Sequence, residues 1–228
     1  MFYNETTKKY SPFVSNIGLV VANNTQNVIL AAGHAGRVGE SIGIKYLNEN
    51  KTDTLGVVSA RVYSIQNMTN SSSDVMAITP VTTINYDLKL NQIIQNNGTI
   101  YDVTKSSGWD YGSSVMLVGK DQDKPGTITY ANVTVSNGPG LYFTNMVLAN
   151  YNSTEGDSGG PVIFHNGTDT LFYGMHSGKF CEIVFEEHGG YTYHNWILNG
   201  TDKICNREHI TLRGFSTWDS ISKDLNLQ

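Results

Sequence analysis

One seven-residue run constrains the fold of this 228-residue chain more than any other stretch: Glu155-Gly156-Asp157-Ser158-Gly159-Gly160-Pro161. Its three glycines let the backbone turn tightly on both sides of Ser158. Such a turn can direct the N–H groups of Gly156 and Ser158 at one point, and a single donor to a developing oxyanion contributes roughly 10²–10³ in rate. A serine hydroxyl is a weak nucleophile unless a neighbouring base activates it. The run therefore predicts a nucleophile whose base comes from elsewhere in the chain.

Short apolar segments separated by turn residues fill most of the chain, as in all-β proteins. Hydrophobic residues make up 39%, and the 23 glycines supply many turns. Strands are expected at 17–21, 28–32, 42–46, 55–58, 60–63, 74–78, 115–118, 127–135, 141–148, 161–164 and 170–178. Residues 80–112 are expected to form a polar crossover, and residues 180–208 an insertion. Trp218, Ile221 and Leu225 have helical spacing, and Ser216 or Thr217 can cap a short C-terminal helix.

A candidate base and a candidate carboxylate both adjoin predicted strands. His34 follows the strand at 28–32 and lies between glycines. Asp74 opens an apolar strand, where burial is costly unless a group such as a histidine N–H bonds to it. The weaker alternatives Asp53, Asp87 and Asp102 lie in more polar, turn-like surroundings. The order along the chain is therefore His34, Asp74, Ser158.

These segments resemble chymotrypsin-like serine proteases. Residues 156–161 match the GDSGGP signature of that family, and residues 32–36 are similar to the AGHCG segment of bacterial members, with Ala35 in place of the cysteine. The pattern is closest to the streptogrisin, alpha-lytic and glutamyl endopeptidase types. The resemblance implies an all-β fold of two six-stranded antiparallel Greek-key β-barrels with a short C-terminal helix. It places His34 and Asp74 in an N-terminal barrel (1–100), and Ser158, the specificity pocket and the helix in a C-terminal barrel (101–228).

The resemblance also implies a function, that of a secreted serine endopeptidase. Ser158 would attack the peptide carbonyl, His34 would carry the proton, and Asp74 would orient His34. The N–H groups of Gly156 and Ser158 would form the oxyanion hole. Lys124 is close to the position where relatives hold an arginine that pairs with the aspartate beside the nucleophile, so a Lys124–Asp157 ion pair is expected. The chain contains no IVGG tetrapeptide, so activation by a freed amino terminus is not expected.

The predicted substrate pocket contains residues that suit an acidic side chain before the cut bond. The resemblance assigns this role to Ser153, His176, Ser177, Gly178 and Lys179. A buried imidazole can donate a hydrogen bond when neutral or carry a charge near pH 6–7. Either state suits Glu or Asp, with Glu preferred. The alternative is that His176 only fills a core strand and that the pocket takes apolar or small residues.

Composition and sequons bear on partners and location. Charged residues are 15% and the net charge is −5, so no basic nucleic-acid footprint is present. No apolar run has the length of a membrane helix. The first residues do not resemble a signal peptide, so the protein is intracellular or its leader and pro-segment were removed. Ten Asn-X-Ser/Thr sequons favour a secreted glycoprotein, which we expect to be a monomer acting on a protein or peptide substrate; they begin at Asn4, Asn23, Asn50, Asn67, Asn70, Asn97, Asn132, Asn152, Asn166 and Asn199. An Asn- and Thr-rich composition without glycans is the alternative.

Cysteines and histidines give weaker signals. Cys181 and Cys205 are the only cysteines, and we expect them to form a disulfide, with two buried thiols as the alternative. His188, His194 and His209 have acidic neighbours but no recognised ligand spacing, so neither a metal nor another cofactor is predicted. Two other functions remain open: a viral polyprotein-processing protease of the same fold, against which the sequons argue, and a non-catalytic protease-fold binding protein.

Overall fold

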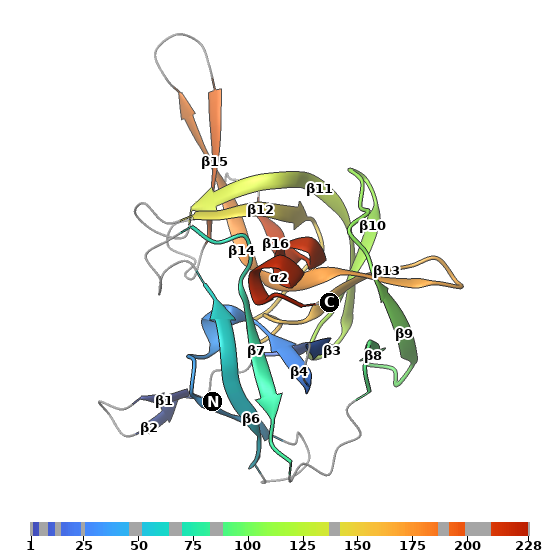
Figure 1. Ribbon diagram of the computed structural model, residues 1–228. Helices are drawn as coiled ribbons and strands as arrows, with labels where there is room; N and C mark the ends of the chain where they lie inside the picture. Colours follow the sequence, from blue (N-terminus) through green and yellow to red (C-terminus); the bar gives the residue numbers. More distant parts are fainter. Residues whose placement is uncertain are drawn as a thin grey trace.

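The described residues form two large β-sheets and one α-helix, as the computed structural model shows (Figure 1). The structure describes residues 2–4, 9–11, 15–23, 26–45, 52–63, 70–82, 89–136, 142–186, 192–198 and 211–227. A separate antiparallel pair, β1 (Phe2–Asn4) and β2 (Lys9–Ser11), precedes the two sheets.

The first sheet contains five antiparallel strands in the order β3-β4-β7-β6-β5. A short 3₁₀ turn, η1 (Gly33–Ala35), follows the second of them. Most side chains of β3, β4 and β7 are buried on both faces of the sheet. Their bounds are β3 (Ile17–Asn23), β4 (Gln26–Ala31), β5 (Ser41–Lys45), β6 (Thr52–Val62) and β7 (Val75–Pro80).

The second sheet contains nine strands, six of which close into a ring. The order is β13-β10-β11-β12-β16-β14, and pairing of β13 with β14 completes the closure. Outside the ring, β9 pairs with β14, β8 pairs with β9, and β15 pairs with β11 and β14. The bounds are β8 (Gln92–Ile94), β9 (Ile100–Lys105), β10 (Ser114–Val118), β11 (Asp123–Ser136), β12 (Tyr142–Ala149), β13 (Pro161–His165), β14 (Thr170–Glu186), β15 (Thr192–Leu198) and β16 (Thr211–Thr217).

One apolar cluster joins the two sheets to the C-terminal helix. It contains Leu19 and Leu30 of the first sheet, Phe172 and Met175 of β14, and Ile221 of α2 (Trp218–Leu225). The side-chain oxygen of Thr217 accepts a hydrogen bond from the Ser220 N–H and caps this helix. Burying these side chains together stabilises the contact between the sheets, at about 1.5–3 kcal/mol for each large apolar group.

The predicted fold class, all-β with a short C-terminal helix, is confirmed. The closed ring has the predicted six strands, whereas the first sheet has five among the described residues. The strands predicted at 55–58 and 60–63 are one strand, β6, because a register shift between Val58 and Ala60 interrupts the apolar pattern without ending the pairing. The predicted crossover at 80–112 contains β8 and β9.

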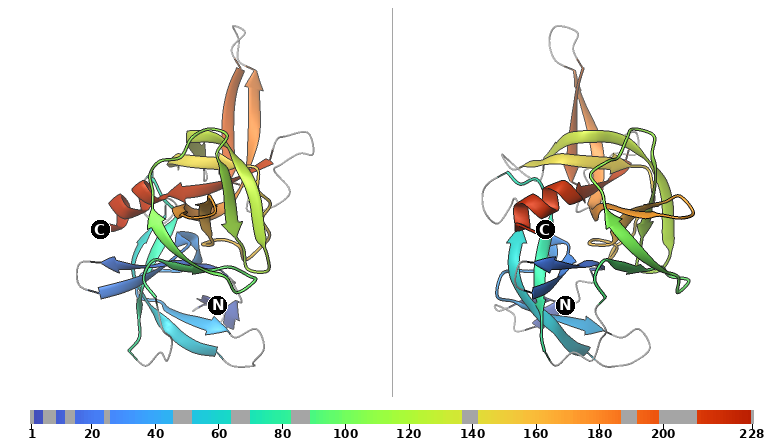
Figure 2. Two further views of the ribbon diagram at one scale, coloured as in Figure 1. Left: turned by 90° about the vertical axis from the view of Figure 1, so that its right-hand side faces the viewer. Right: turned by 45° about the vertical axis from the view of Figure 1, so that its right-hand side comes forward.

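The region predicted as an insertion contains the far end of the long strand β14 and all of β15. β14 continues to Glu186 and pairs with β15, and this hairpin extends away from the rest of the second sheet in all three views (Figure 2). The predicted boundary between residues 100 and 101 falls at the start of β9, and the division into two domains stays a prediction.

Candidate active site

Ser158 lies in the loop between β12 and β13, which is folded into consecutive tight turns. The Asp157 N–H donates to the Thr154 carbonyl at 3.1 Å, and the Gly160 N–H donates to the Asp157 carbonyl at 2.9 Å. Gly156 has φ +93°, a conformation that favours glycine. In the described part of the chain, neither the Gly156 N–H nor the Ser158 N–H donates a hydrogen bond to another group. Both donors are therefore available to a ligand beside the Ser158 hydroxyl.

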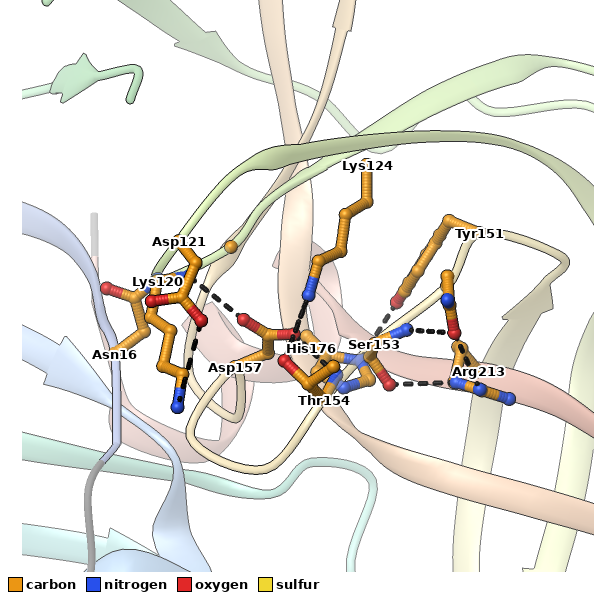
Figure 3. A network of polar contacts seen from close by, with 12 residues as sticks. Asn16, Lys120, Asp121, Lys124, Tyr151, Ser153, Thr154, Asp157, His176 and Arg213 are labelled. Carbon is orange, nitrogen blue, oxygen red and sulfur yellow. Dashed lines mark hydrogen bonds and ion pairs between the residues drawn. The ribbon is translucent and has the colours of Figure 1, made fainter. Parts of the chain in front are cut away.

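Asp157 is fully buried and anchors this loop to β11. Its carboxylate forms an ion pair with Lys124 and accepts hydrogen bonds from the N–H groups of Thr154 at 2.6 Å and Lys120 at 2.9 Å (Figure 3). Burial alone would raise the pKa of Asp157, but the bonds from Lys124, Thr154 and Lys120 hold it below its usual value. The predicted Lys124–Asp157 ion pair is confirmed.

His34 and Asp74 meet because the strands that carry them are paired. His34 lies in η1 directly after β4, Asp74 directly precedes β7, and Ala31 of β4 is opposite Met76 of β7. The His34 Nδ1 lies 2.7 Å from one Asp74 oxygen, and the His34 N–H donates to the other at 2.8 Å. Burial lowers the pKa of His34, but the charge and hydrogen bond of Asp74 outweigh it, so the net shift is upward. The carboxylate thus fixes both the ring and the backbone of His34.

Asp74 is also bonded to a residue of the second sheet, Ser216 of β16. The Asp74 N–H donates to the Ser216 hydroxyl at 2.9 Å, and the Ser216 and Ser177 hydroxyls are 3.1 Å apart. Ser177 is also next to the candidate nucleophile, because its carbonyl oxygen lies 3.4 Å from Ser158 Oγ. β14 and β16 therefore connect the surroundings of Asp74 with those of Ser158.

The loop carrying Ser158 packs against the first sheet near His34. The Ser158 carbonyl accepts hydrogen bonds from the Asn16 N–H at 2.7 Å and the Ser15 hydroxyl at 2.8 Å. A Cβ added to Gly159 would lie 2.9 Å from the backbone nitrogen of Ala32, two residues before His34. Only a glycine permits this approach, so the turn brings the three candidate catalytic segments into one region between the sheets.

The residues predicted to bind substrate lie around the same loop. His176 and Ser177 are buried on β14, whereas Gly178, Lys179 and Ser153 are half-buried. The His176 Nδ1 lies 3.0 Å from the Tyr151 hydroxyl. Burial lowers the pKa of His176 to about 3, although Asp157 acts in the opposite direction. The sequence left the neutral and the charged state of this imidazole open, and the lowered pKa favours the neutral state near pH 7.

Arg213 is a member of this region that sequence reasoning missed. Its Nε donates to the Ser153 hydroxyl at 2.8 Å, and one terminal nitrogen donates to the Asn152 side-chain oxygen at 3.1 Å (Figure 3). No motif surrounds Arg213 in the sequence. The register of β16, which places Arg213 opposite Ala149 of β12 and Lys179 of β14, brings it to the loop. A prediction of which strands pair, and in which register, could have identified Arg213 from the sequence.

Other predicted features have few described residues. Cys181 is buried, but Cys205 lies outside the described residues, so the disulfide stays a prediction. His188 and His209 also lie outside them, and nothing is described of the His194 side chain. Within the described ranges, no cluster of three or more histidine, cysteine or acidic side chains could hold a metal ion. No described helix has the length and apolar character to cross a bilayer.

Comparisons with known proteins give matches among solved structures. No family model matches the chain, and no curated protein matches its sequence. The chain is similar to Protease A of Thermobifida fusca, with a TM-score of 0.63 and 19% identity over 96% of this chain and 93% of that chain. It is similar to Nocardiopsis protease, with a TM-score of 0.61 and 23% identity over 93% and 90%.

A third similar structure is described as a glutamic acid specific serine protease that uses a histidine triad in substrate binding. Its TM-score is 0.60 and its identity 16%, over 93% of this chain and 91% of that chain. The three likenesses extend over nearly all of this chain, and they show that it has the fold of the bacterial chymotrypsin-like serine proteases.

Proposed function

We propose that the chain is a serine endopeptidase that hydrolyses peptide bonds through Ser158, His34 and Asp74. The observation that carries the proposal is the pair of bonds from Asp74 to His34, next to the tight turn that presents Ser158. Asp74 holds the imidazole with its Nδ1 side occupied, which leaves Nε2 as the proton acceptor. The fold shared with serine proteases supports the same assignment.

The reaction follows from these roles. Ser158 Oγ attacks the carbonyl carbon of the substrate while His34 takes its proton, and a tetrahedral oxyanion forms. The N–H groups of Gly156 and Ser158, which have no other described acceptor, donate to that oxygen. His34 then gives the proton to the leaving amine, which leaves an acyl group on Ser158. Water activated by His34 releases the acyl group and restores the serine.

Labelling with a fluorophosphonate probe tests this proposal directly. The probe reacts with a serine only when the hydroxyl is activated. We expect the folded protein to be labelled at one site, and Ser158→Ala to abolish both labelling and peptide cleavage. Ser222→Ala removes a hydroxyl on α2 that bonds only to its own helix and should leave both intact. A wild-type protein that takes up no probe would instead support the non-catalytic binding alternative.

The finer part of the proposal is an acidic residue, Glu above Asp, before the cut bond. Two residues of the proposed pocket contact the Ser158 loop: the Ser177 carbonyl lies 3.4 Å from Ser158 Oγ, and the His176 backbone bonds to Gly159 and Gly160. Ser153 lies in that loop, and Gly178 and Lys179 follow Ser177 on β14. One structural neighbour is described as glutamic acid specific. In this chain the described partner of the His176 Nδ1 is a tyrosine, Tyr151, so any acid recognition would differ from one based on several histidines. Matched peptides that vary only at this position test the preference.

We also propose that the protein is secreted and glycosylated. Among its sequon asparagines, Asn70, Asn97, Asn132, Asn152 and Asn166 are exposed, and Asn23 is half-buried. The side chain of Asn4 is not described, and Asn50, Asn67 and Asn199 lie outside the described residues. Exposure is what glycan attachment requires. Protein from its own host should lose mass on enzymatic glycan removal; an unchanged intact mass would contradict this proposal.

A further inference from the structure

The half-buried guanidinium of Arg213 lies beside the candidate active site without a carboxylate partner. Among the described residues, no Asp or Glu oxygen lies within 4.0 Å of it, and its bonding partners are the neutral groups of Ser153 and Asn152. Burial accordingly lowers the pKa of Arg213 below its usual value. A partly desolvated cation is costly unless an anion compensates it. No described residue supplies that anion, so a carboxylate of a ligand can take this place.

The orientation of the guanidinium is fixed by its two described bonds. The Nε–H and one terminal N–H are occupied by Ser153 and Asn152. A guanidinium carries five N–H donors in a rigid planar fork, so three donors remain. A carboxylate can accept two of these in parallel, which is the strongest arrangement for this pair of groups. The site is therefore preorganised for a carboxylate in particular.

Two chains of contacts connect Arg213 to the surroundings of Ser158. Arg213 bonds to Ser153 and Asn152, which lie in the loop that carries Ser158. In the other direction, Lys179 is opposite Arg213 across the sheet, two residues after Ser177, whose carbonyl touches Ser158 Oγ. Arg213 thus lies beside this loop, on the side where we expect the substrate side chain before the cut bond to bind.

We propose that Arg213 forms a carboxylate-binding subsite that selects Glu or Asp immediately before the cut bond. This inference rests on the proposed protease function and names the residue that sets its specificity. His176 does not supply the charge, because its imidazole is buried and its Nδ1 is bonded to Tyr151. Ser153 and Asn152 act as positioning residues that aim the guanidinium.

Matched peptides that differ only before the cut bond test this assignment. The series carries Glu, Asp, Gln, Leu or Lys there, and kcat/KM is normalised to the active sites titrated with fluorophosphonate. The wild type should prefer Glu to its neutral isostere Gln. In Arg213→Gln the Glu/Gln ratio should fall roughly 10- to 100-fold, the size expected for lost charge-assisted hydrogen bonds. Arg213→Lys, which keeps the charge without the fork, should be intermediate, and Arg213→Glu should favour the Lys peptide.

Controls separate charge at this position from charge in general. Lys223→Gln removes one positive charge from the exposed face of α2 and should leave the Glu/Gln ratio unchanged. The inference is overturned by an Arg213→Gln enzyme that labels normally and keeps the wild-type ratio. It is equally overturned if His176→Gln abolishes the ratio while Arg213→Gln does not.

A wild-type measurement covers the case in which the Arg213 variants do not fold. Among the described residues, the titratable side chains around Arg213 are Tyr151 on the loop and His176 and Lys179 on β14. Because a guanidinium stays charged, the Glu/Gln ratio should be constant from roughly pH 6 to 9. A ratio that falls as pH rises through roughly 7 would assign recognition to an imidazole and overturn the proposal. Normal labelling with no preference for Glu refutes the Arg213 subsite alone; absence of labelling refutes the protease function and the subsite with it.

Discussion

His34 and His176 have opposite pKa shifts although burial lowers the pKa of both imidazoles. Asp74 reverses the effect at His34, through its charge and its hydrogen bond. At His176 the bonded neighbour is the neutral Tyr151 hydroxyl, and the pKa falls to about 3. A single bonded carboxylate thus distinguishes a candidate base from an imidazole fixed in a strand.

The pH dependence of cleavage should report the His34–Asp74 pair. Catalysis requires neutral His34, so kcat/KM should rise with pH, with a midpoint above the usual 6.5 because the pKa of His34 is raised. In Asp74→Asn, burial acts unopposed, so the midpoint should move to lower pH while the maximal rate falls by roughly 10⁴. Steady-state kinetics with the preferred peptide over a range of pH measures both changes.

Asp102→Asn is the matched control for this experiment. Asp102 is an exposed carboxylate on β9 that bonds to Gln92, and it was a weaker sequence candidate for the same role. Its replacement should leave both midpoint and rate unchanged. An Asp74→Asn enzyme with the wild-type profile would remove Asp74 from the mechanism.

Individual residues of the site differed in how well the sequence predicted them. His34, Asp74 and Ser158 each have a distinctive local context, and the contacts of Lys124 with Asp157 agree with prediction. Arg213 has no such context, because its role depends on cross-strand register and on two side chains about sixty residues away. Contacts of this kind can be identified only once the pairing and register of the strands are known.

At the scale of elements, one ion pair connects β11 to the loop of the candidate nucleophile. Lys124→Met would leave the Asp157 carboxylate buried with only neutral donors, which should cost about 3–5 kcal/mol of unfolding free energy and reduce the rate of fluorophosphonate labelling. Urea unfolding at neutral pH measures the loss. Lys124→Met/Asp157→Asn should recover part of it, because the unpaired charge is then absent.

The pH dependence of this loss has a defined sign. The folded pKa of Asp157 is lowered, so its contribution to stability is present above its unfolded value near 3.8 and is lost as pH falls through the folded pKa. The difference between wild type and Lys124→Met should therefore narrow in acid. Lys120→Met is the control, since only the backbone of Lys120 bonds to Asp157, and it should cost less than about 1 kcal/mol. A Lys124→Met protein as stable and as active as wild type would contradict the prediction.

Elements were predicted well where local patterns decide them and less well where pairing does. The C-terminal helix and its Thr217 cap agree with the sequence pattern. The continuity of β6 was missed, because a bulge beside Ser59 resembles a strand end in sequence. β8 and β9 were also missed, since their apolar residues are sparse and their strands depend on pairing, β9 with β14 and β8 with β9.

At the scale of the whole molecule, the sheets should unfold together. The cluster with Leu30, Phe172 and Ile221 draws on both sheets and α2, and the Asn16 side chain of the first sheet's edge donates to the Val118 carbonyl of the second at 3.0 Å. We therefore expect one cooperative thermal transition. Far-UV circular dichroism, which follows both sheets, should coincide with tryptophan fluorescence, to which Trp218, packed on Phe172, contributes. Two separated transitions would show that the sheets are independent domains.

The bond between Lys124 and Asp157 has a consequence for how such a protein could be controlled. In some serine proteases, an amino terminus freed by cleavage pairs with the aspartate beside the nucleophile. Here an internal lysine, present from synthesis onward, already forms that ion pair. On the proposed function, the chain would become competent as it folds, with no later trigger at this point. The proposed protease activity would then have to be controlled by when the chain folds, by its export to another compartment, or by an inhibitor bound at Ser158.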